Sequence, residues 1–128
     1  MKFEPPGPLA ELLGIRAERF DEGAATFGLT VRDDHMNPYG AVHGGVVYSL
    51  VDTAMGAAVH TRLARGERCA TIEIKINDLA PVTAGELRAE ARLVERTKRI
   101  GVLEARVRGG GDQLVAVATG TFYIQPSL

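Results

Sequence analysis

A run of small apolar residues near the middle of the chain constrains the fold more than any other feature. Residues Val46–Val59 read V-V-Y-S-L-V-D-T-A-M-G-A-A-V, and Asp52 is the only formally charged residue among them. The run is shorter than the roughly 20 residues that a membrane span requires. We therefore predict a core helix from His43 to Ala64, ended by Arg65 and Gly66. Glycine costs a helix about 1 kcal/mol relative to alanine, so the small residues predict close packing by a neighbouring surface.

The segments on both sides of this helix alternate between apolar and polar residues, as half-buried strands do. Ahead of it, Leu9–Leu13 has helical spacing, and Gly14 is a natural helix end. We predict an α+β fold in which an antiparallel sheet of about six strands wraps around one long central helix, with a short N-terminal helix. The predicted strands are Ile15–Phe20, Ala24–Arg32, Arg68–Leu79, Glu86–Thr97, Ile100–Gly109 and Gln113–Ile124.

Length and composition fit a single domain over residues 1–128, beginning with an extended segment at residues 1–8. The formal net charge of -1 provides no general attraction to nucleic acid or to an anionic membrane. The single cysteine, Cys69, cannot form an internal disulfide, and the amino terminus lacks the apolar core of a signal peptide. We therefore expect a soluble cytoplasmic protein with no nucleic acid or membrane partner.

Asp52 is the first candidate for chemistry. A lone carboxylate among apolar side chains costs several kcal/mol unless it is paired or neutralised, and no basic residue lies three or four positions away. In apolar surroundings its pKa is expected to rise, which suits a general base working near neutrality. The structural alternative is a buried carboxylate that is hydrogen-bonded to a neighbouring strand.

Gly44 and Gly45 lie at the predicted start of the same helix. Peptide N–H groups there lack partners, and the helix dipole favours negative charge, so these amides are candidates for stabilising an oxyanion. Alternatively, the glycines only permit a tight turn, and His43 only caps the helix. The chain has no HExxH, CxxC or glycine-rich phosphate loop, and we expect no metal.

The spacing of these two candidates predicts an assembly. Gly44 and Asp52 are eight positions apart, which is about 12 Å along a helix axis. One carbonyl group cannot lie about 3 Å from both. If both groups serve one site, one of them comes from a second copy of the chain, and we expect a two-fold dimer with sites at its interface.

The stretch N-P-Y-G-A-V-H-G-G at Asn37–Gly45, followed by V-V-Y-S-L-V-D-T-A, resembles the signature of hotdog-fold acyl-CoA thioesterases. The resemblance is greatest to the group named for the phenylacetate-pathway thioesterase, which includes the human thioesterase superfamily member 2 type. It covers about residues 9–125, and Asp52 stands where a related hydroxybenzoyl-CoA branch has Glu. It implies a sheet curled around the central helix, and homodimers that pair further into homotetramers.

The resemblance also implies roles for individual residues. Asp52 matches the carboxylate that acts as nucleophile or as general base towards water. Gly44 matches the amide of the opposing subunit that holds the thioester oxygen, with Asn37 assisting. His43 matches the side chain that orients the loop or the thioester. Thr71, ten residues before Pro81, matches a residue that places the water, although Ala70 is adjacent and a shift of one position would change this match.

We expect the substrate to be an aryl- or medium-chain acyl-CoA, with coenzyme A entering as part of the substrate and no separate cofactor. Thioester hydrolysis needs only a base or nucleophile and an oxyanion hole. By resemblance, the turn Thr97-Lys98-Arg99 lies near the coenzyme; each charge is alternatively an ordinary solvated one. Further candidates for substrate contact are Gly45 and Tyr48. Met36, Tyr39 and Met55 are either further pocket residues or core packing.

Two other functions remain open for this chain. A hotdog enoyl-CoA hydratase or dehydratase would use a histidine paired with an acidic residue, and no Asp-x4-His pattern occurs here. A non-catalytic acyl-CoA-binding protein of this fold would bind the thioester without hydrolysing it. Assays of thiol release and of enoyl-CoA hydration would distinguish both functions from that of a thioesterase.

Overall fold

The computed structural model of the protein describes residues 6–128. The predicted extended segment at residues 1–8 falls largely outside them, and the first helix already begins at Pro8. The elements follow in the order α1 (Pro8–Leu13), β1 (Arg16–Asp21), β2 (Ala24–Thr30), η1 (Asp33–His35), α2 (Gly44–His60), β3 (Arg68–Asp78), β4 (Glu86–Arg96), β5 (Ile100–Arg108), η2 (Gly110–Asp112) and β6 (Leu114–Gln125).

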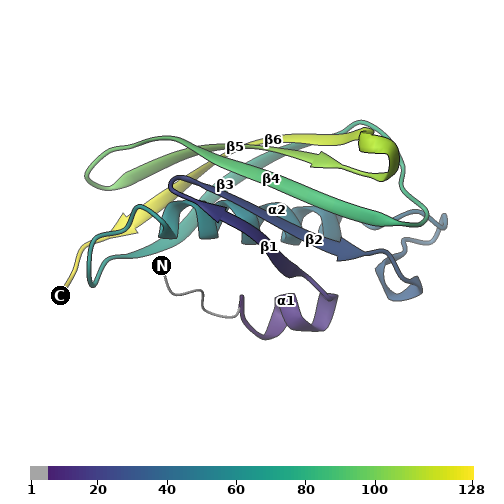
Figure 1. Ribbon diagram of the computed structural model, residues 1–128, viewed down its shortest axis with the longest axis horizontal. Coiled ribbons are helices and arrows are strands. Elements are labelled where there is room, and N and C mark those ends of the chain that lie inside the picture. The colour runs from purple at the N-terminus through teal and green to yellow at the C-terminus, as the bar shows by residue number, and fades with distance from the viewer. Residues whose placement is uncertain (1–5) are drawn as a thin grey trace.

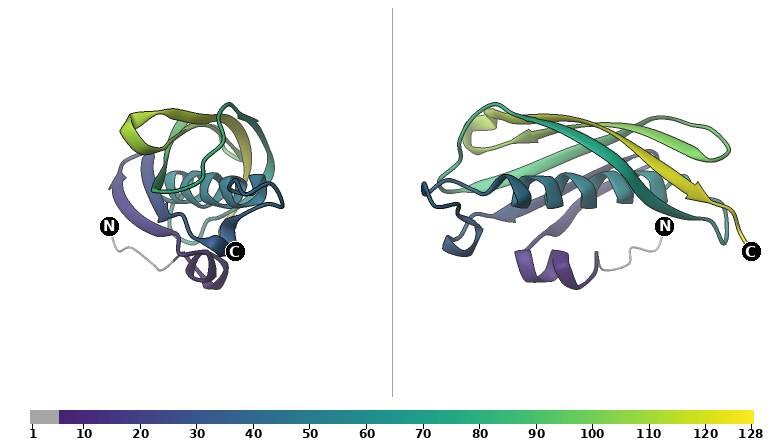
Figure 2. Two further views of the ribbon diagram at one scale, coloured as in Figure 1. Left: turned by 90° about the vertical axis from the view of Figure 1, so that its right-hand side faces the viewer. Right: turned by 180° about the vertical axis from the view of Figure 1, so that it is seen from behind.

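The six strands form one antiparallel sheet in the order β1-β2-β4-β5-β6-β3. The sheet curls around α2, which runs along its concave side, and α1 lies below β1 (Figures 1 and 2). This arrangement confirms the predicted α+β hotdog architecture. Strands β1 and β3 form the two edges, so each has a single neighbour in the sheet.

The central helix is shorter than the predicted His43–Ala64. At its start, His43 has an extended backbone and is the N-cap, since its side chain accepts a hydrogen bond from the Gly45 N–H. At its end, the Thr61 hydroxyl donates to the Ala58 carbonyl at 2.7 Å and accepts from the Gly23 N–H at 2.7 Å. The helix therefore stops where its last turn is attached to the β1–β2 hairpin.

One face of α2 supplies the centre of the core. Its residues Leu50, Ala54 and Met55 are completely buried against the concave side of the sheet. A Cβ atom at Gly120 of β6 would lie 2.8 Å from the Met55 Sδ atom, so a larger residue there would displace the packed Met55 side chain. On the helix itself, a Cβ atom at Gly56 would lie 3.6 Å from the Phe122 ring, which is an ordinary contact distance, so the predicted need for glycine at this position is not seen.

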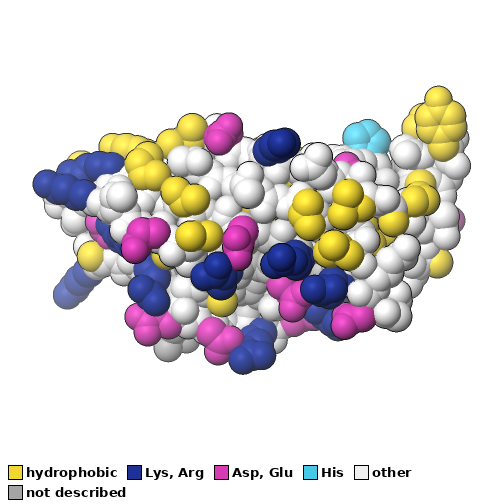
Figure 3. Space-filling model, turned by 90° about the horizontal axis from the view of Figure 1, so that it is seen from above, with side chains coloured by type: hydrophobic (Ala, Val, Ile, Leu, Met, Phe, Trp, Pro, Cys, Tyr) yellow, Lys and Arg dark blue, Asp and Glu magenta, His cyan; other side chains and the backbone are white. Residues whose placement is uncertain are grey.

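The outer face of the sheet carries most of the charged residues of β4 and β5. Arg92 pairs with Glu104 across these strands at 2.7 Å, and Arg108 pairs with Glu90 at 3.0 Å. Figure 3 shows acidic and basic side chains interleaved on this face. The basic residues of these strands thus face solvent, as the alternation predicts. Within residues 6–128, no helix is both long enough and apolar enough to cross a membrane.

Candidate active site

The loop between β2 and α2 is fixed by a buried histidine. The His35 side chain is 1% exposed, its Nδ1 accepts from the Arg32 N–H at 3.1 Å, and its Nε2 lies 2.8 Å from the Leu13 carbonyl oxygen. Because Nδ1 accepts, Nε2 carries the proton and donates to Leu13. The His35 carbonyl accepts from the His43 N–H at 2.8 Å, so one residue connects α1, the loop and the start of α2.

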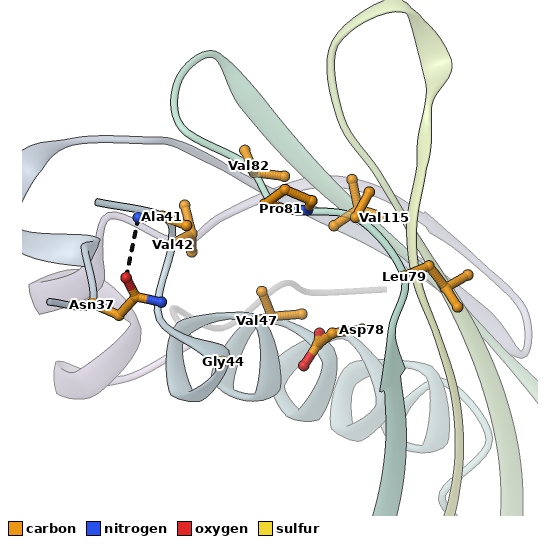
Figure 4. A pocket seen from close by; sticks show the side chains of 11 residues that line it. Asn37, Ala41, Val42, Gly44, Val47, Asp78, Leu79, Pro81, Val82 and Val115 are labelled. Atoms are coloured by element: carbon orange, nitrogen blue, oxygen red, sulfur yellow. Dashed lines mark hydrogen bonds between the residues drawn. The ribbon is translucent and has the colours of Figure 1, made fainter. Parts of the chain in front are cut away.

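Asn37 lies in this loop with its side-chain amide held in one orientation. Its Oδ1 accepts from the Tyr39 N–H at 2.9 Å and the Ala41 N–H at 3.1 Å. The tight turn that follows includes Gly40, whose φ of 82° favours glycine. With the oxygen occupied, the Nδ2 donor faces the other way, over the start of α2 (Figure 4). Within residues 6–128, Nδ2 has no hydrogen-bond acceptor.

The start of α2 leaves one amide free. His43 Nδ1 accepts from the Gly45 N–H at 2.8 Å, so His43 caps the helix, as in the alternative interpretation of this residue. The same bond occupies Gly45, which therefore offers no free amide to a ligand. Among the described residues, the Gly44 N–H has no acceptor, and Gly44 lies on the wall of a cavity.

This cavity has a volume of about 320 Å³ and opens between the start of α2, the loop before it, the end of β3 with the segment that follows, and the start of β6 (Figure 4). That size is near the lower end of the roughly 300–1,000 Å³ typical of ligand pockets. The polar side chains on its wall are Asn37 and Asp78. Its apolar wall is formed mainly by Val42, Val47, Leu79, Pro81, Val82 and Val115.

Asp52 lies away from this cavity, on the open face of α2. It is half-buried rather than enclosed by apolar side chains, because the helix turns its other face into the sheet. Its Oδ1 accepts a hydrogen bond of 2.6 Å from the Thr71 hydroxyl of β3. Asp52 is therefore hydrogen-bonded to a neighbouring strand, as in the structural alternative. The strand residue that donates this bond is Thr71, not the adjacent Ala70.

The thiol of Cys69 lies near this carboxylate. Burial, and then the negative charge of Asp52, raise the pKa of the Cys69 thiol above its ordinary value. Neutral thiols are poor nucleophiles. Cys69 therefore has the properties of a packing residue.

The candidates for an acyl pocket, each of which was alternatively a core-packing residue, do not line this cavity. Met55 is wholly buried in the core, whereas Tyr39 is 95% exposed at the tip of its loop. Tyr48 is 39% exposed on the same open face of α2 as Asp52, and Met36 packs against the core. Helical periodicity located Tyr48 and Met55 on α2 but did not show which face of the helix meets the cavity.

The turn Thr97-Lys98-Arg99 lies at the opposite end of the sheet from the cavity (Figure 1). Thr97 closes it, because its hydroxyl accepts from the Ile100 N–H at 3.1 Å. Arg96 fixes it by donating to the carbonyl groups of Thr97 and Lys98 and to the Glu67 carboxylate at 2.9 Å. Within one copy of the chain, this turn therefore lies far from Asn37 and Gly44.

The structure adds two residues that the sequence did not single out. His35 gave no signal beyond being a lone histidine in a loop, since its partners are backbone groups distant in the sequence. Asp78 looked like the polar end of an alternating strand. Within residues 6–128, no group of three or more His, Cys, Asp or Glu residues is arranged to hold a metal ion.

A sheet curled around a helix, with a free amide at the helix start and a carboxylate two turns later, defines a hotdog thioesterase-type protein. The chain belongs to the thioesterase superfamily, whose profile matches residues 39–116. The predicted family and the predicted class of enzyme, a thioester hydrolase, are thereby confirmed.

Known relatives agree with this assignment. The chain is 33% identical over 113 residues to the acyl-coenzyme A thioesterase PaaI of Escherichia coli, covering 87% of this chain and 78% of the relative. A conserved protein of Pseudomonas aeruginosa superposes with a TM-score of 0.88 at 36% identity, covering 92% of this chain and 94% of that one. A thioesterase of Haemophilus influenzae superposes with a TM-score of 0.89 at 28% identity, covering 94% and 84%.

Proposed function

We propose that this protein is an acyl-CoA thioesterase that hydrolyses an aryl- or medium-chain acyl-CoA to the free acid and CoA. One observation carries the proposal. Two hydrogen-bond donors, the Gly44 N–H and Asn37 Nδ2, are left free beside an apolar cavity, as an acyl thioester requires. The relatives named as thioesterases support the same chemistry.

In this proposal the thioester oxygen accepts hydrogen bonds from Gly44 and Asn37. Negative charge develops on that oxygen in the transition state, so preorganised donors lower the barrier. Asp52 of a second copy acts as general base towards water or attacks the carbonyl carbon itself. In the first case water adds to the carbon as Asp52 takes its proton, and then the C–S bond breaks and the proton passes to the CoA thiolate. In the second case the C–S bond breaks, CoA leaves as the thiolate, and water then hydrolyses the mixed anhydride to release the acid and restore the Asp52 carboxylate. Thr71 holds Asp52 in place and helps to position the water.

The surface of the monomer supports a homodimer. Asp52 and Tyr48 lie on the open face of α2, and the adjacent strand β3 is a sheet edge with Ile72 54% exposed. An unpaired edge strand is a template for pairing with another copy. Pairing there would bring Asp52 of one copy towards Gly44 of the other. We also propose that two such dimers form a homotetramer, as the family resemblance implies.

The coenzyme part of the substrate would lie along the dimer surface. Lys98 and Arg99 would bind its phosphates, to which Arg and Lys make strong charge-assisted hydrogen bonds. Thr97 would keep their turn in shape. His43, Gly45 and Tyr48 would contact the thioester and the start of the pantetheine arm, with His43 also holding the helix start.

The test is release of free thiol from a panel of acyl- and aryl-CoA esters by the wild-type protein and by Asp52→Asn. Asp21→Asn, at the far end of β1, is a matched control for loss of one carboxylate. We expect Asp52→Asn to lose at least 100-fold in kcat and the control to be unchanged. Equal rates for Asp52→Asn and wild type would overturn the role of Asp52. Tight binding of intact acyl-CoA without thiol release would favour a non-catalytic binding protein.

A further inference from the structure

The carboxylate of Asp78 lies beside the proposed oxyanion donors within one copy of the chain. Asp78 is the last residue of β3 and lines the cavity together with Gly44 and Asn37 (Figure 4). Its Oδ2 would be 3.6 Å from a Cβ atom placed on Gly44. The Asp78 backbone pairs with β6, but within residues 6–128 its carboxylate makes no hydrogen bond or ion pair.

A carboxylate in this position restricts what the cavity can hold. The remaining wall is apolar, which suits an acyl chain better than the two amides of a pantetheine arm. If the thioester oxygen is held by Gly44 and Asn37, the first carbons of the acyl group pass close to Asp78. An ionised carboxylate only accepts hydrogen bonds, and it repels a second carboxylate at short range.

We propose that Asp78 is a specificity-determining residue, which makes the site prefer acyl groups with a hydroxyl or other hydrogen-bond donor near the thioester carbonyl. By the same physics, it disfavours acyl groups that end in a carboxylate. This inference rests on the proposed thioesterase function and specifies its substrate class. It assigns Asp78 no proton transfer and no covalent step, since the proposed base is Asp52.

The size of the effect follows from the exposure of Asp78. A fully buried group built to bind a substrate hydroxyl can reject the analogue without it by a factor of about 10⁴ or more. Asp78 is exposed at the cavity mouth, and water competes with the substrate there. We therefore expect a preference of about tenfold in each direction.

The experiment compares kcat/KM for two pairs of thioesters, 3-hydroxyhexanoyl-CoA with hexanoyl-CoA and succinyl-CoA with butyryl-CoA. The proteins are wild type, Asp78→Asn, Asp78→Val and the control Asp21→Asn, each checked for its melting temperature. We expect wild type to prefer the hydroxylated thioester about tenfold and Asp78→Val to lose this preference. Asp78→Asn, which keeps the size but removes the charge, should raise succinyl-CoA turnover relative to butyryl-CoA about tenfold.

The outcomes separate the two proposals. If wild type hydrolyses none of the thioesters, the proposed function fails and this inference fails with it. If wild type is active but both ratios are unchanged in the Asp78 variants, only the inference is overturned. If Asp78→Asn loses turnover on all four thioesters while remaining folded, Asp78 takes part in the chemistry and its assignment as a specificity residue is wrong.

Discussion

Thr71 of β3 donates a hydrogen bond of 2.6 Å to Oδ1 of Asp52 on α2. The bond links the strand at the edge of the sheet to the open face of the central helix. It leaves the other carboxylate oxygen without a protein partner among the described residues. A carboxylate held by one oxygen in this way has a fixed direction and one oxygen available for a substrate or a water molecule.

Replacing Thr71 with valine should lower activity without unfolding the protein. Valine has nearly the same shape but no hydroxyl, so Asp52 would lose its orienting bond. A hydrogen bond to a charged group contributes about 1.5–3 kcal/mol, which corresponds to about 10- to 100-fold in rate. We expect a loss of this size in kcat/KM, measured by thiol release. Thr119→Val, on the exposed outer face of β6, is the control, and equal activity of the two variants would contradict the prediction.

His35 is expected to contribute mainly to stability. His35→Ala would leave the Arg32 N–H and the Leu13 carbonyl without their partners. A polar group left unsatisfied in a buried site costs about 1–3 kcal/mol, and these two bonds are only partly buried. With the packing of the buried ring also lost, the free energy of unfolding should fall by about 2–4 kcal/mol. Urea unfolding would measure the change. The control is His60→Ala, at the exposed end of α2, and similar values for both variants would show that His35 does not anchor the loop.

Glu67 gives a prediction for the dependence of stability on pH. Hydrogen bonds from Arg96, and next from the Ala64 N–H, lower the pKa of Glu67 below its ordinary value of 4.5. Because the folded pKa is the lower one, the contribution to stability is present above the ordinary value. It is lost as the pH falls through the folded pKa.

We therefore expect Glu67→Gln to flatten the pH dependence of the unfolding free energy below about pH 4.5. The difference from wild type should be largest at neutral pH and should shrink as the solution is acidified. Urea unfolding between about pH 3 and 7 would measure it. Glu11→Gln, an exposed carboxylate on α1, is the control. A difference from wild type that is the same at every pH would contradict the assignment.

Much of the fold was predictable because its signals are local. Alternation located every strand to within a few residues. The free amide at Gly44 was anticipated from the predicted helix start, whereas Asn37 was singled out only by the family resemblance. The role of both as oxyanion donors stays a prediction. The sequence also correctly placed Gly44 and Asp52 on one helix, about two turns apart.

Other features depend on contacts that the sequence does not display. Asp52 was expected to be enclosed, but periodicity cannot show which face of a helix a sheet leaves open. Asp78 falls on a polar position of an alternating strand and resembles any solvated residue there. Its place beside Gly44 follows from the end of β3 meeting the start of α2, which are distant in the sequence. His35 was missed for the same reason.

The proposal that each site combines two copies of the chain can be tested by mixing two inactive variants. Asn37→Asp keeps an oxygen for the Tyr39 and Ala41 amides but replaces the Nδ2 donor with negative charge. It should lower kcat at least 100-fold, as loss of an oxyanion donor does. Asp52→Asn should be similarly inactive. In a mixed dimer, one site would combine the intact Asn37 of one copy with the intact Asp52 of the other.

Mixing the two variants in equal amounts with free subunit exchange makes about half of the dimers mixed, each with one intact site of two. Thiol release should therefore recover to roughly a quarter of the wild-type rate per subunit. The two variants would carry different affinity tags, so that mixed dimers can be purified and their presence verified. Each variant exchanged with itself is the control and should stay inactive. Verified mixed dimers that remain inactive would contradict the proposal that Asn37 and Asp52 of one site come from two different copies.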